Sequence, residues 1–519
     1  MNDWRQTLVK FYVFATLVMM PLYYENGYFN TLMAKAHIFW VTAGVVLFMA
    51  ALVESVGLGF GKTGLKPVGE IISNINVMDI SVATFGAAAV LSWLLSDYRY
   101  EAFTGSSGWH MGAGTIILLV FMYVYVSRNF VLGEITFAFL LGAASLLFLL
   151  GLLNGIGIDP LSLHTKLSSD EMYEYIATIG NVNSYAGYLS LVLPVIMALH
   201  IIGYERWQRI WSGIVVTLGF MNLFMGNSDG AFLGVGLGCF FLIAYSLRKG
   251  WKYVRLFSCG IFFGAASFTC KLLESFWPGD MVSFLGVPEF ILDTNIYMPI
   301  VAVCIILVLR YRYYEKHLTD KNTKIAAAVF TVLGICAIIA VVGYNALIFD
   351  GEWGTKRGYI WGFALSLFKD GSIREKLVGV GADCFGIPVM NIYSDFVEQH
   401  WGKRVVNAHN EYLQYLVTTG LIGAAGYIMM YVSAVRECIK KQNWCEEKGI
   451  WLFGIMGYAG QAVVNNPQAL NMATLFLFLA IYRSFTYNQT IRERAKILEN
   501  QKDQIYELFD TEEQNECQR

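Results

Sequence analysis

Long apolar segments recur along almost the whole sequence, and they restrict the fold more than any other feature. A helix that crosses a bilayer needs about 20 predominantly apolar residues, because its backbone polar groups must be satisfied inside the helix. About fourteen segments meet this requirement. They run at 8–24, 37–58, 77–96, 111–127, 131–153, 184–203, 208–226, 229–247, 253–272, 294–312, 325–346, 408–435, 450–466 and 468–487. The sequence therefore predicts an all-α polytopic membrane protein, a helical bundle of about 12–14 transmembrane helices.

The composition excludes several other classes of protein. Hydrophobic residues make up 56% of the chain and charged residues 15%, whereas an ordinary soluble domain is about a quarter charged. These figures exclude a soluble enzyme, a collagen-like chain and a disulfide-stapled secreted domain. The nine cysteines are scattered and form no zinc or disulfide framework. The net charge of −2 gives no general attraction to nucleic acid.

The basic residues of the connections predict how the chain is oriented in the membrane. They gather in alternate connections. These residues are Lys62, Lys66, Arg128, Arg206, Arg209, Arg248, Lys249, Lys252, Arg310, Arg312, Lys316, Lys321, Lys324, Arg436, Lys440, Lys441 and Lys448. The positive-inside rule assigns these connections, and both termini with them, to the cytoplasm, so the number of crossings is expected to be even.

Two connections on the predicted outer side are long, 154–183 and 347–407. Long connections are commonly functional. The second has helical apolar periodicity over 359–370 and a Gly-rich turn at 379–386. Four regions are therefore expected. These are transmembrane helices 1–11 in 1–346, an extracytoplasmic loop with short helices in 347–407, the C-terminal transmembrane helices in 408–487 and a charged cytoplasmic tail in 488–519.

Distinctive polar residues gather at the outer ends of the predicted helices. They come from six stretches of the chain. These are Trp109 and His110, Asn181 and Asn183, Asp229, Arg357 and Trp361, His409 to Glu411, and Asn465 to Gln468. A histidine exchanges protons near neutral pH. An arginine presents a permanently charged planar fork that suits phosphate. Their shared location favours a site at one face of the membrane.

Each of these stretches also has a purely structural interpretation. His409 could cap its helix or donate to a carbonyl group, and Asn181 or Asp229 could be an N-cap. Arg357 and Trp361, four residues apart, could form a local cation–π pair. The run Asn465 to Gln468 suits a turn. Three further acids, Glu54, Asp79 and Glu134, fall within apolar runs, where an ionisable residue is costly and commonly functional.

The stretch after the long outer loop carries a family signature. His409-Asn410, nine further residues and Gly420-Leu-Ile-Gly423 together resemble the signature of the O-antigen ligase and O-antigen polymerase superfamily. The segment from Arg357 to Trp361, followed by Gly379 to Phe385, resembles the part that leads into this signature. Gly180 to Ala186 resembles the Gly-Asn-x-Asn segment of the same family. The resemblance extends over residues 90–480, and the order and spacing of the motifs make it specific.

One position departs from the family pattern. Members often carry Ser-Arg-Gly at the outer start of a middle helix, where the arginine is thought to bind the phosphates of the donor. This chain has Ser228-Asp229-Gly230 instead. Either Arg357 compensates for the missing cation or the donor sits differently. Lys356, Lys403 and Arg404 are further basic residues that could substitute.

The resemblance implies a glycosyltransferase C-like fold and a bacterial enzyme of the cytoplasmic (inner) membrane, with its active site on the extracytoplasmic face. Its donor would be a lipid-linked oligosaccharide on undecaprenyl pyrophosphate, and its acceptor a glycan, lipid or protein. The reaction would invert the anomeric carbon without metal or cofactor. His409 would be the base and Arg357 the phosphate clamp. Substrate-binding roles would fall to Asn410, Glu411, Asn181, Asn183, Trp361 and Asp229.

Two other functions stay open at this point. A polytopic transporter or flippase of lipid-linked glycans would place its ionic groups near the bilayer midplane, often on broken helices. A peptidoglycan polymerase of the shape, elongation, division and sporulation type has a related architecture. Within the favoured class, a ligase and a polymerase differ only in the acceptor, and the sequence does not choose between them.

Overall fold

The computed structural model describes residues 2–59, 74–106, 108–168, 171–249, 252–276, 283–311, 319–439 and 446–490. Predicted features beyond these ranges lie outside the described residues. They include most of the charged tail 488–519 and the basic residues Lys62, Lys66, Arg312, Lys316, Lys440 and Lys441.

The described chain is helical apart from one small hairpin. The first half holds α1 (Asn2–Phe14), the π-helical turn η1 (Ala15–Met19), α2 (Met20–Leu22), α3 (Thr31–Gly59), α5 (Val77–Leu95), α6 (Arg99–Thr104), α7 (Ala113–Asn129), α8 (Glu134–Gly155), the 3-10 turn η2 (Met172–Glu174), β1 (Tyr175–Ile176), β2 (Gly180–Asn181), α9 (Val182–Ile202), α10 (Arg206–Met225) and α11 (Asp229–Lys249). The second half holds α12 (Tyr253–Phe276), α13 (Val287–Thr294), α14 (Tyr297–Leu309), α16 (Asp320–Leu347), α17 (Trp353–Asp370), α18 (Ile373–Val378), α19 (Gly386–Trp401), α20 (Glu411–Thr418), α21 (Gly420–Ile439), α22 (Glu446–Gln461) and a last helix, Ala469–Thr490.

Every apolar segment expected to cross the membrane is helical, which confirms the all-α polytopic fold. Eight of the described helices are long and apolar enough to span a bilayer, and a ninth is added if α13 and α14, bent by 68°, form one span. This number is below the predicted 12–14 because some expected spans are short or interrupted. Helix α7 has 17 residues and α22 has 16, and the expected span 408–435 is divided between α20 and α21.

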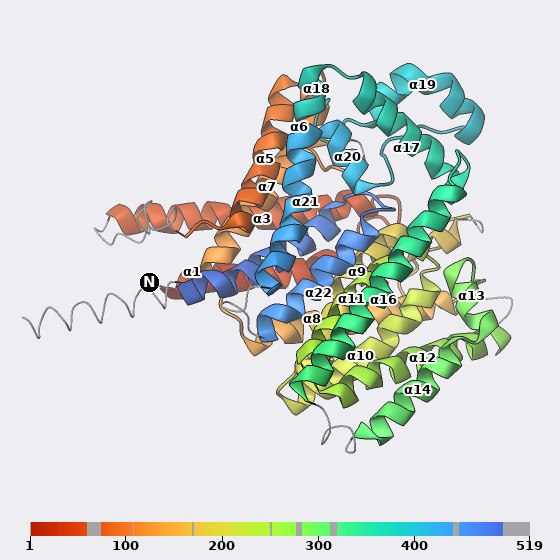
Figure 1. The fold of residues 1–519 in the computed structure, drawn as a ribbon. Coiled ribbons are helices and arrows are strands. Elements are labelled where there is room, and N and C mark those ends of the chain that lie inside the picture. The colour runs from red at the N-terminus through yellow and green to blue at the C-terminus, as the bar shows by residue number, and fades with distance from the viewer. Residues whose placement is uncertain are drawn as a thin grey trace, which may run out of the picture.

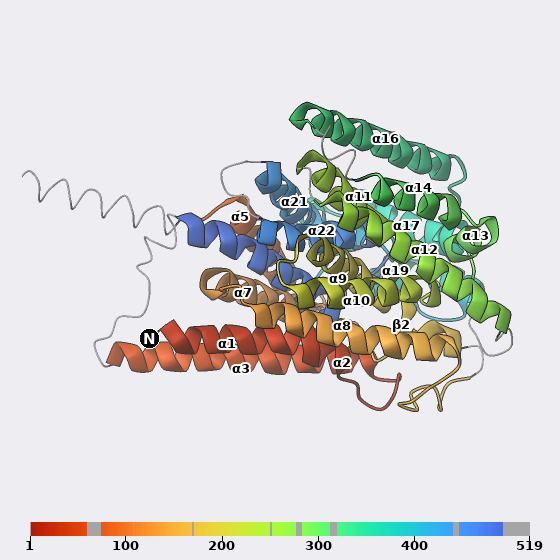
Figure 2. The same ribbon diagram turned by 90° about the horizontal axis from the view of Figure 1, so that it is seen from below.

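Helix α9 forms the centre of the bundle. The membrane-length window of this helix is 100% buried, and it packs against α10, α11 and α22. The last helix, Ala469–Thr490, is almost as deeply buried. Helix α16, in contrast, is only 6% buried and lies at the edge of the molecule (Figure 2), as expected of a helix whose apolar side chains face lipid. Helices α1 and α3 lie side by side and extend from one flank (Figure 1).

The long connection 347–407 is a folded unit. It contains α17, α18 and α19, so the helix expected at 359–370 is confirmed within α17. A separate apolar cluster holds α17, α19 and α20 together. It consists of Ile360, Phe363, Ala364, Phe385, Val389, Val397, Val405, Ala408 and Val417. In Figure 1, α17, α18 and α19 lie together at one end of the molecule, beside α6 and α20.

The Gly-rich turn at 379–386 is confirmed, and it meets the break between α20 and α21. Gly379 has φ +81° and Gly420 has φ +68°, both in the left-handed region that glycine tolerates. A Cβ on Gly379 would collide with the backbone of Thr418, and one on Gly420 with the backbone of Leu377. The two backbones touch there, and Val380 N–H donates to Val417 O at 3.0 Å. This contact fixes where α20 ends.

The acids within the apolar runs have structural roles or solvent-facing positions. Asp79 lies 3.0 Å from Arg128 and 2.9 Å from Arg483, and it accepts a hydrogen bond of 2.9 Å from the hydroxyl of Tyr123. Glu54 accepts a hydrogen bond of 2.8 Å from Nε of Arg5. Glu134 is exposed in the first turn of α8. We call the group of Asp79, Arg128, Arg483 and Tyr123 the Asp79 cluster.

Candidate functional site

A cavity of about 630 Å³ brings together side chains from separate stretches of the chain. We call it the His409 cavity. Its polar lining residues include Glu25, Asn30, Thr31, His37, Trp109, His110, Asn181, Asn183, His409, Asn465 and Asn466. Four of the six stretches that the sequence predicts at the outer side therefore meet at one cavity. It opens near the start of α9 and the turn before the last helix.

The backbone around His409 turns its imidazole toward this cavity. His409 itself has φ +47°, a left-handed conformation that costs energy for a residue other than glycine. The next residue, Asn410, caps α20, because its side-chain oxygen accepts the N–H of Leu413 at 3.0 Å. On the other side, the N–H of Ala408 donates to the side chain of Gln414 at 2.9 Å. Both neighbours of His409 are thus fixed by hydrogen bonds, and His409 itself lines the cavity.

One contact and a shifted pKa describe the His409 ring. Its Nδ1 atom lies 3.2 Å from the amide nitrogen of Asn466. Burial, together with the positive charges of Arg357 and Lys403, lowers the pKa of His409 to about 4. The ring is therefore neutral at pH 7. Neither Arg357 nor Lys403 lines the His409 cavity, so both act on the ring through their charge alone.

Arg357 stands after a left-handed turn at the start of α17. Gly354, Thr355 and Lys356 have φ values of +61°, +59° and +69°. Burial lowers the pKa of Arg357, and the charge of Asp229 raises it. Among the residues that the structure describes, no hydrogen bond or ion pair of this guanidinium is found. A half-buried cation with no such partner is a ready site for an anion.

The other basic residues expected near the site have different positions. Lys356 donates to the carbonyl of His400 at 2.7 Å and faces the ring of Trp401, so its ammonium group is occupied. Lys403 acts on His409 through its charge. Of these two, Lys403 is the one that the structure brings to the histidine.

Asp229 joins two helix starts. It is the first residue of α11, and its Oδ1 accepts the N–H of Val287, the first residue of α13, at 2.9 Å. Its charge also reaches Arg357. The acid therefore both caps α13 and partly offsets the charge of the arginine.

Asn181 and Asn183 line the His409 cavity at the N-terminus of α9. The side chain of Asn181 accepts the N–H of Asn183 at 2.9 Å, so the expected N-cap is present. The carbonyl of Asn183 accepts a hydrogen bond of 2.9 Å from Asn465, which ties α9 to the turn carrying Asn466. Asn181 therefore both caps α9 and lines the cavity.

Four predicted substrate-binding residues do not line the His409 cavity: Asp229, whose contacts are given above, and Asn410, Glu411 and Trp361. Asn410 caps α20, as described above. Glu411 is fully buried and accepts hydrogen bonds from the hydroxyls of Tyr427 and Tyr458, the latter at 2.6 Å. Trp361 packs on Trp353, with ring centroids 5.1 Å apart, and stacks on Phe349. Among the described residues, no cation–π contact joins Trp361 to Arg357.

The sequence missed one wall of the cavity. It consists of the residues between α2 and α3 and the first turns of α3, including Tyr28, Asn30 and His37. Polar residues do gather in that connection, between two apolar segments, but no motif marks them. Only the packing of α3 against α7 brings this connection to His110, whose ring makes an edge contact with Trp40 at 5.5 Å.

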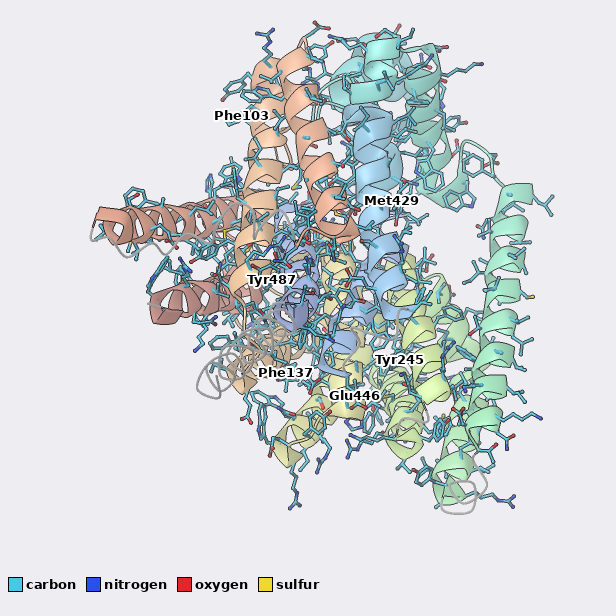
Figure 3. All side chains as sticks on the ribbon, turned by 60° about the vertical axis from the view of Figure 1, so that its left-hand side comes forward. Phe103, Phe137, Tyr245, Met429, Glu446 and Tyr487 are labelled. Atoms are coloured by element: carbon cyan, nitrogen blue, oxygen red, sulfur yellow. The ribbon has the colours of Figure 1, made fainter. Side chains whose placement is uncertain are left out.

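A second cavity lies among apolar helices. It measures about 610 Å³ and is lined by side chains of α9, α10, α11, α12 and α14. On α11 it begins with Phe232, Val235 and Cys239, within the first three turns after Asp229. An apolar cavity thus begins one turn from the acid whose charge acts on Arg357. Figure 3 shows the side chains on the whole bundle, with Tyr245 of α11 labelled.

Residues 290–428 match the family model described as O-antigen ligase. The matched stretch includes α14, α16, the three helices after it, His409 and Arg357, whereas Asn181, Asn183 and Asp229 lie before it. This match confirms the resemblance to the O-antigen ligase superfamily. It supports a membrane protein of the glycan ligase or polymerase type, acting on lipid-linked glycans. A search of curated proteins finds no match to the chain.

Proposed function

We propose that this protein transfers or polymerises a glycan from an undecaprenyl-pyrophosphate donor onto an acceptor sugar, at the outer face of the bacterial cytoplasmic membrane. The observation that carries the proposal is the electrostatic effect of Arg357 on His409. A half-buried guanidinium without a hydrogen-bonding or ion-pairing partner among the described residues acts on a neutral imidazole at the wall of a polar cavity. A pyrophosphate is the kind of anion that such a guanidinium binds.

The neutral imidazole suits the role of base. The hydroxyl oxygen of the acceptor bonds to the anomeric carbon with inversion, while its proton moves to the free ring nitrogen of His409. The bond from the anomeric carbon to the pyrophosphate oxygen breaks, and its electron pair leaves with polyprenyl pyrophosphate. Arg357 offsets the charge that develops on this leaving group. Bound pyrophosphate would also offset the charges that lower the pKa of His409, and so make the ring a stronger base.

Asn466 is proposed to hold the ring in the form that the reaction needs. Its Oδ1 atom is buried and has no hydrogen-bond partner among the described residues, whereas its Nδ2 atom lies 3.2 Å from Nδ1 of His409. The oxygen and nitrogen of an amide are assigned by their hydrogen bonds. With the amide turned over, Oδ1 accepts a hydrogen bond from the Nδ1–H group, and the lone pair of Nε2 is free to act as base. Asn466 is then a positioning residue.

The apolar cavity along α11 is proposed to hold the polyprenyl chain. It starts one turn from Asp229, so a lipid whose pyrophosphate is bound at Arg357 would place its chain beside Phe232 and Val235. The transporter alternative expects ionic groups near the bilayer midplane. The charged residues of the Asp79 cluster already have partners, and those near the His409 cavity gather at a helix end.

Transfer by the purified protein tests the proposal. The full chain in detergent is given a lipid-linked oligosaccharide donor and an acceptor prepared from the same strain, and the products are followed by mass spectrometry. We expect a longer or newly linked glycan and free polyprenyl pyrophosphate, with the same rate in EDTA as without it. No transfer with any acceptor, beside movement of the lipid-linked donor across vesicle membranes, would instead support a flippase. A strict requirement for a divalent ion would contradict the metal-independent chemistry.

A further inference from the structure

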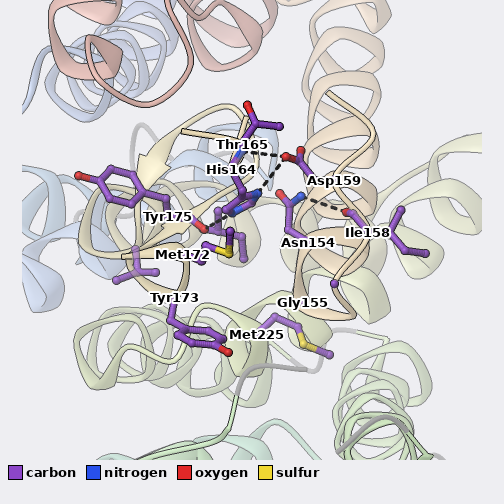
Figure 4. A pocket seen from close by; sticks show the side chains of 13 residues that line it. Asn154, Gly155, Ile158, Asp159, His164, Thr165, Met172, Tyr173, Tyr175 and Met225 are labelled. Carbon is purple, nitrogen blue, oxygen red and sulfur yellow. Dashed lines mark hydrogen bonds and ion pairs between the residues drawn. The ribbon is translucent and has the colours of Figure 1, made fainter. Parts of the chain in front are cut away.

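A smaller pocket lies behind the β1–β2 hairpin, next to the His409 cavity (Figure 4). It measures about 290 Å³, near the lower end of the range of roughly 300–1,000 Å³ that is typical of small-molecule sites. Its walls come from the end of α8, the connection 157–176, the start of α9 and Met225 at the end of α10. We call it the hairpin pocket.

A single layer of aromatic side chains separates the two spaces. Tyr175 lines both, and its partner across the hairpin is Asn181, which lines the His409 cavity. Tyr28, another residue of that cavity, has its ring centroid 5.0 Å from that of Tyr175 and 5.1 Å from that of His164. His164 lines the hairpin pocket. Both spaces meet the start of α9, so they lie at the same end of the bundle.

The polar wall of the hairpin pocket presents an unsatisfied acceptor. Asp159 Oδ2 accepts the backbone N–H of His164 at 2.7 Å and lies 3.4 Å from Nδ1 of the same residue. The second carboxylate oxygen, Oδ1, is buried and has no hydrogen-bond donor among the described residues. A buried acceptor without a donor costs free energy, and a ligand hydroxyl would remove that cost.

The opposite wall is aromatic and apolar. Figure 4 shows Tyr173 and Met225 across the pocket from Asp159 and Asn154. Tyr173 is 55% exposed, so its ring is free to cover a ligand. A sugar ring has hydroxyl groups around its edge and an apolar face of C–H groups. A carboxylate on one side and an aromatic ring on the other suit that combination, whereas the carboxylate disfavours phosphate or another anion.

We propose that the hairpin pocket is a glycan subsite, which binds an uncharged sugar residue of the substrate beyond the sugar that reacts at His409. The inference rests on the proposed function, because it takes the substrate to be a glycan. The inference adds that the enzyme binds at least one sugar besides the one that reacts. The sugar bound in the hairpin pocket belongs either to the acceptor or to the donor, and the KM values of the two substrates distinguish these cases.

The test uses Tyr173→Ala in the purified full chain. Loss of an aromatic contact of about 1.4 kcal/mol corresponds to a tenfold change in an equilibrium constant, so we expect KM to rise about tenfold for one of the two glycan substrates, with kcat unchanged. Tyr173→Phe, which keeps the ring, should restore the KM of the wild type. Tyr100→Ala, at a tyrosine of α6 that is 77% exposed and outside both spaces, is the matched control.

A rise in the KM of the acceptor assigns the pocket to the acceptor, and a rise in the KM of the donor assigns it to the donor. An unchanged KM for both substrates overturns the inference, as does a fall in kcat alone, which indicates a structural role. Binding is measured separately by saturation-transfer NMR on a soluble oligosaccharide released from the donor by mild acid. Loss of its signal in Tyr173→Ala supports the subsite even if the wild type transfers nothing, a result that would refute only the proposed function.

Discussion

The Asp79 cluster and the pair of Arg357 and His409 are two solutions to the same problem, a charged side chain removed from water. In the Asp79 cluster, one carboxylate meets two guanidinium groups and a tyrosine hydroxyl within 3.0 Å. Near the His409 cavity, Arg357 has no such contact among the described residues, and a neighbouring imidazole is forced to be neutral. A buried charge whose partners are complete serves the fold, and one whose partners are incomplete is available to a ligand.

The largest expected effect is on activity at the incomplete site. His409→Ala should reduce glycan transfer by roughly 10²–10⁴-fold, the usual contribution of a general base. Since the ring has a single hydrogen-bonding contact within the described part of the chain, 3.2 Å to Asn466, the thermal stability in detergent should stay near that of the wild type. Near-normal turnover in this variant would exclude His409 as the base and contradict the contrast drawn between the His409 site and the Asp79 cluster.

A substitution in the Asp79 cluster should instead lower stability and leave substrate binding unchanged. Asp79→Asn leaves two arginines without their carboxylate, and breaking a buried pair in this way costs about 3–5 kcal/mol. We expect a lower Tm and poor yield, whereas the KM of the surviving protein should not change. The measurement is thermal unfolding in detergent beside transfer kinetics. A stable but inactive Asp79→Asn would show that the cluster has a role beyond the fold.

Arg357→Lys separates charge from geometry. A lysine keeps the positive charge but loses the planar fork that meets two phosphate oxygens, and a pair of charged hydrogen bonds is worth about 1.5–3 kcal/mol. Transfer should therefore fall about tenfold to a hundredfold, with unchanged stability. Equal turnover of lysine and arginine at this position would mean that the residue acts only through its charge.

The smallest effects concern the pKa of His409. The base must be neutral, so kcat/KM should be lost only as the pH falls toward 4 and should be flat from pH 6 to 8. Lys403→Gln removes one of the charges that lower this pKa, so the acid limb should move to higher pH by a few tenths of a unit. The pH profile of the purified enzyme measures both. A limb that does not move in Lys403→Gln would exclude an electrostatic link between the two residues.

Most of the fold could be predicted from the sequence because apolar length and periodicity are local properties. The helix over 359–370 and the turn at 379–386 were predicted for that reason. The division of 408–435 into α20 and α21 was not, because it depends on a contact between Gly420 and the end of α18, far away in the chain. The number of membrane-length helices was overestimated for the same reason.

The candidate site was predictable only as a shared location. The positions of His409, Asn181 and Asn183 at helix starts indicated one face of the bundle, and these residues do line one cavity. The directions of side chains were not predictable. Glu411 lies two residues from His409, yet its carboxylate faces the tyrosines of α21 and α22. The wall formed by Tyr28 and His37 depends on how α3 packs, which no motif in the sequence records.

Because the backbones touch at Gly379 and Gly420, the number of residues between His409 and Gly420 fixes the rotation of His409 about the axis of α20. With one end of α20 clamped against α18, each residue added to or removed from that helix would rotate its other end by about 100°. One insertion would therefore swing the imidazole out of the cavity while every residue of the motif remained present. The number of residues between His409 and Gly420 therefore sets the direction of the imidazole, and the contact at the two glycines keeps α20 from rotating about its axis.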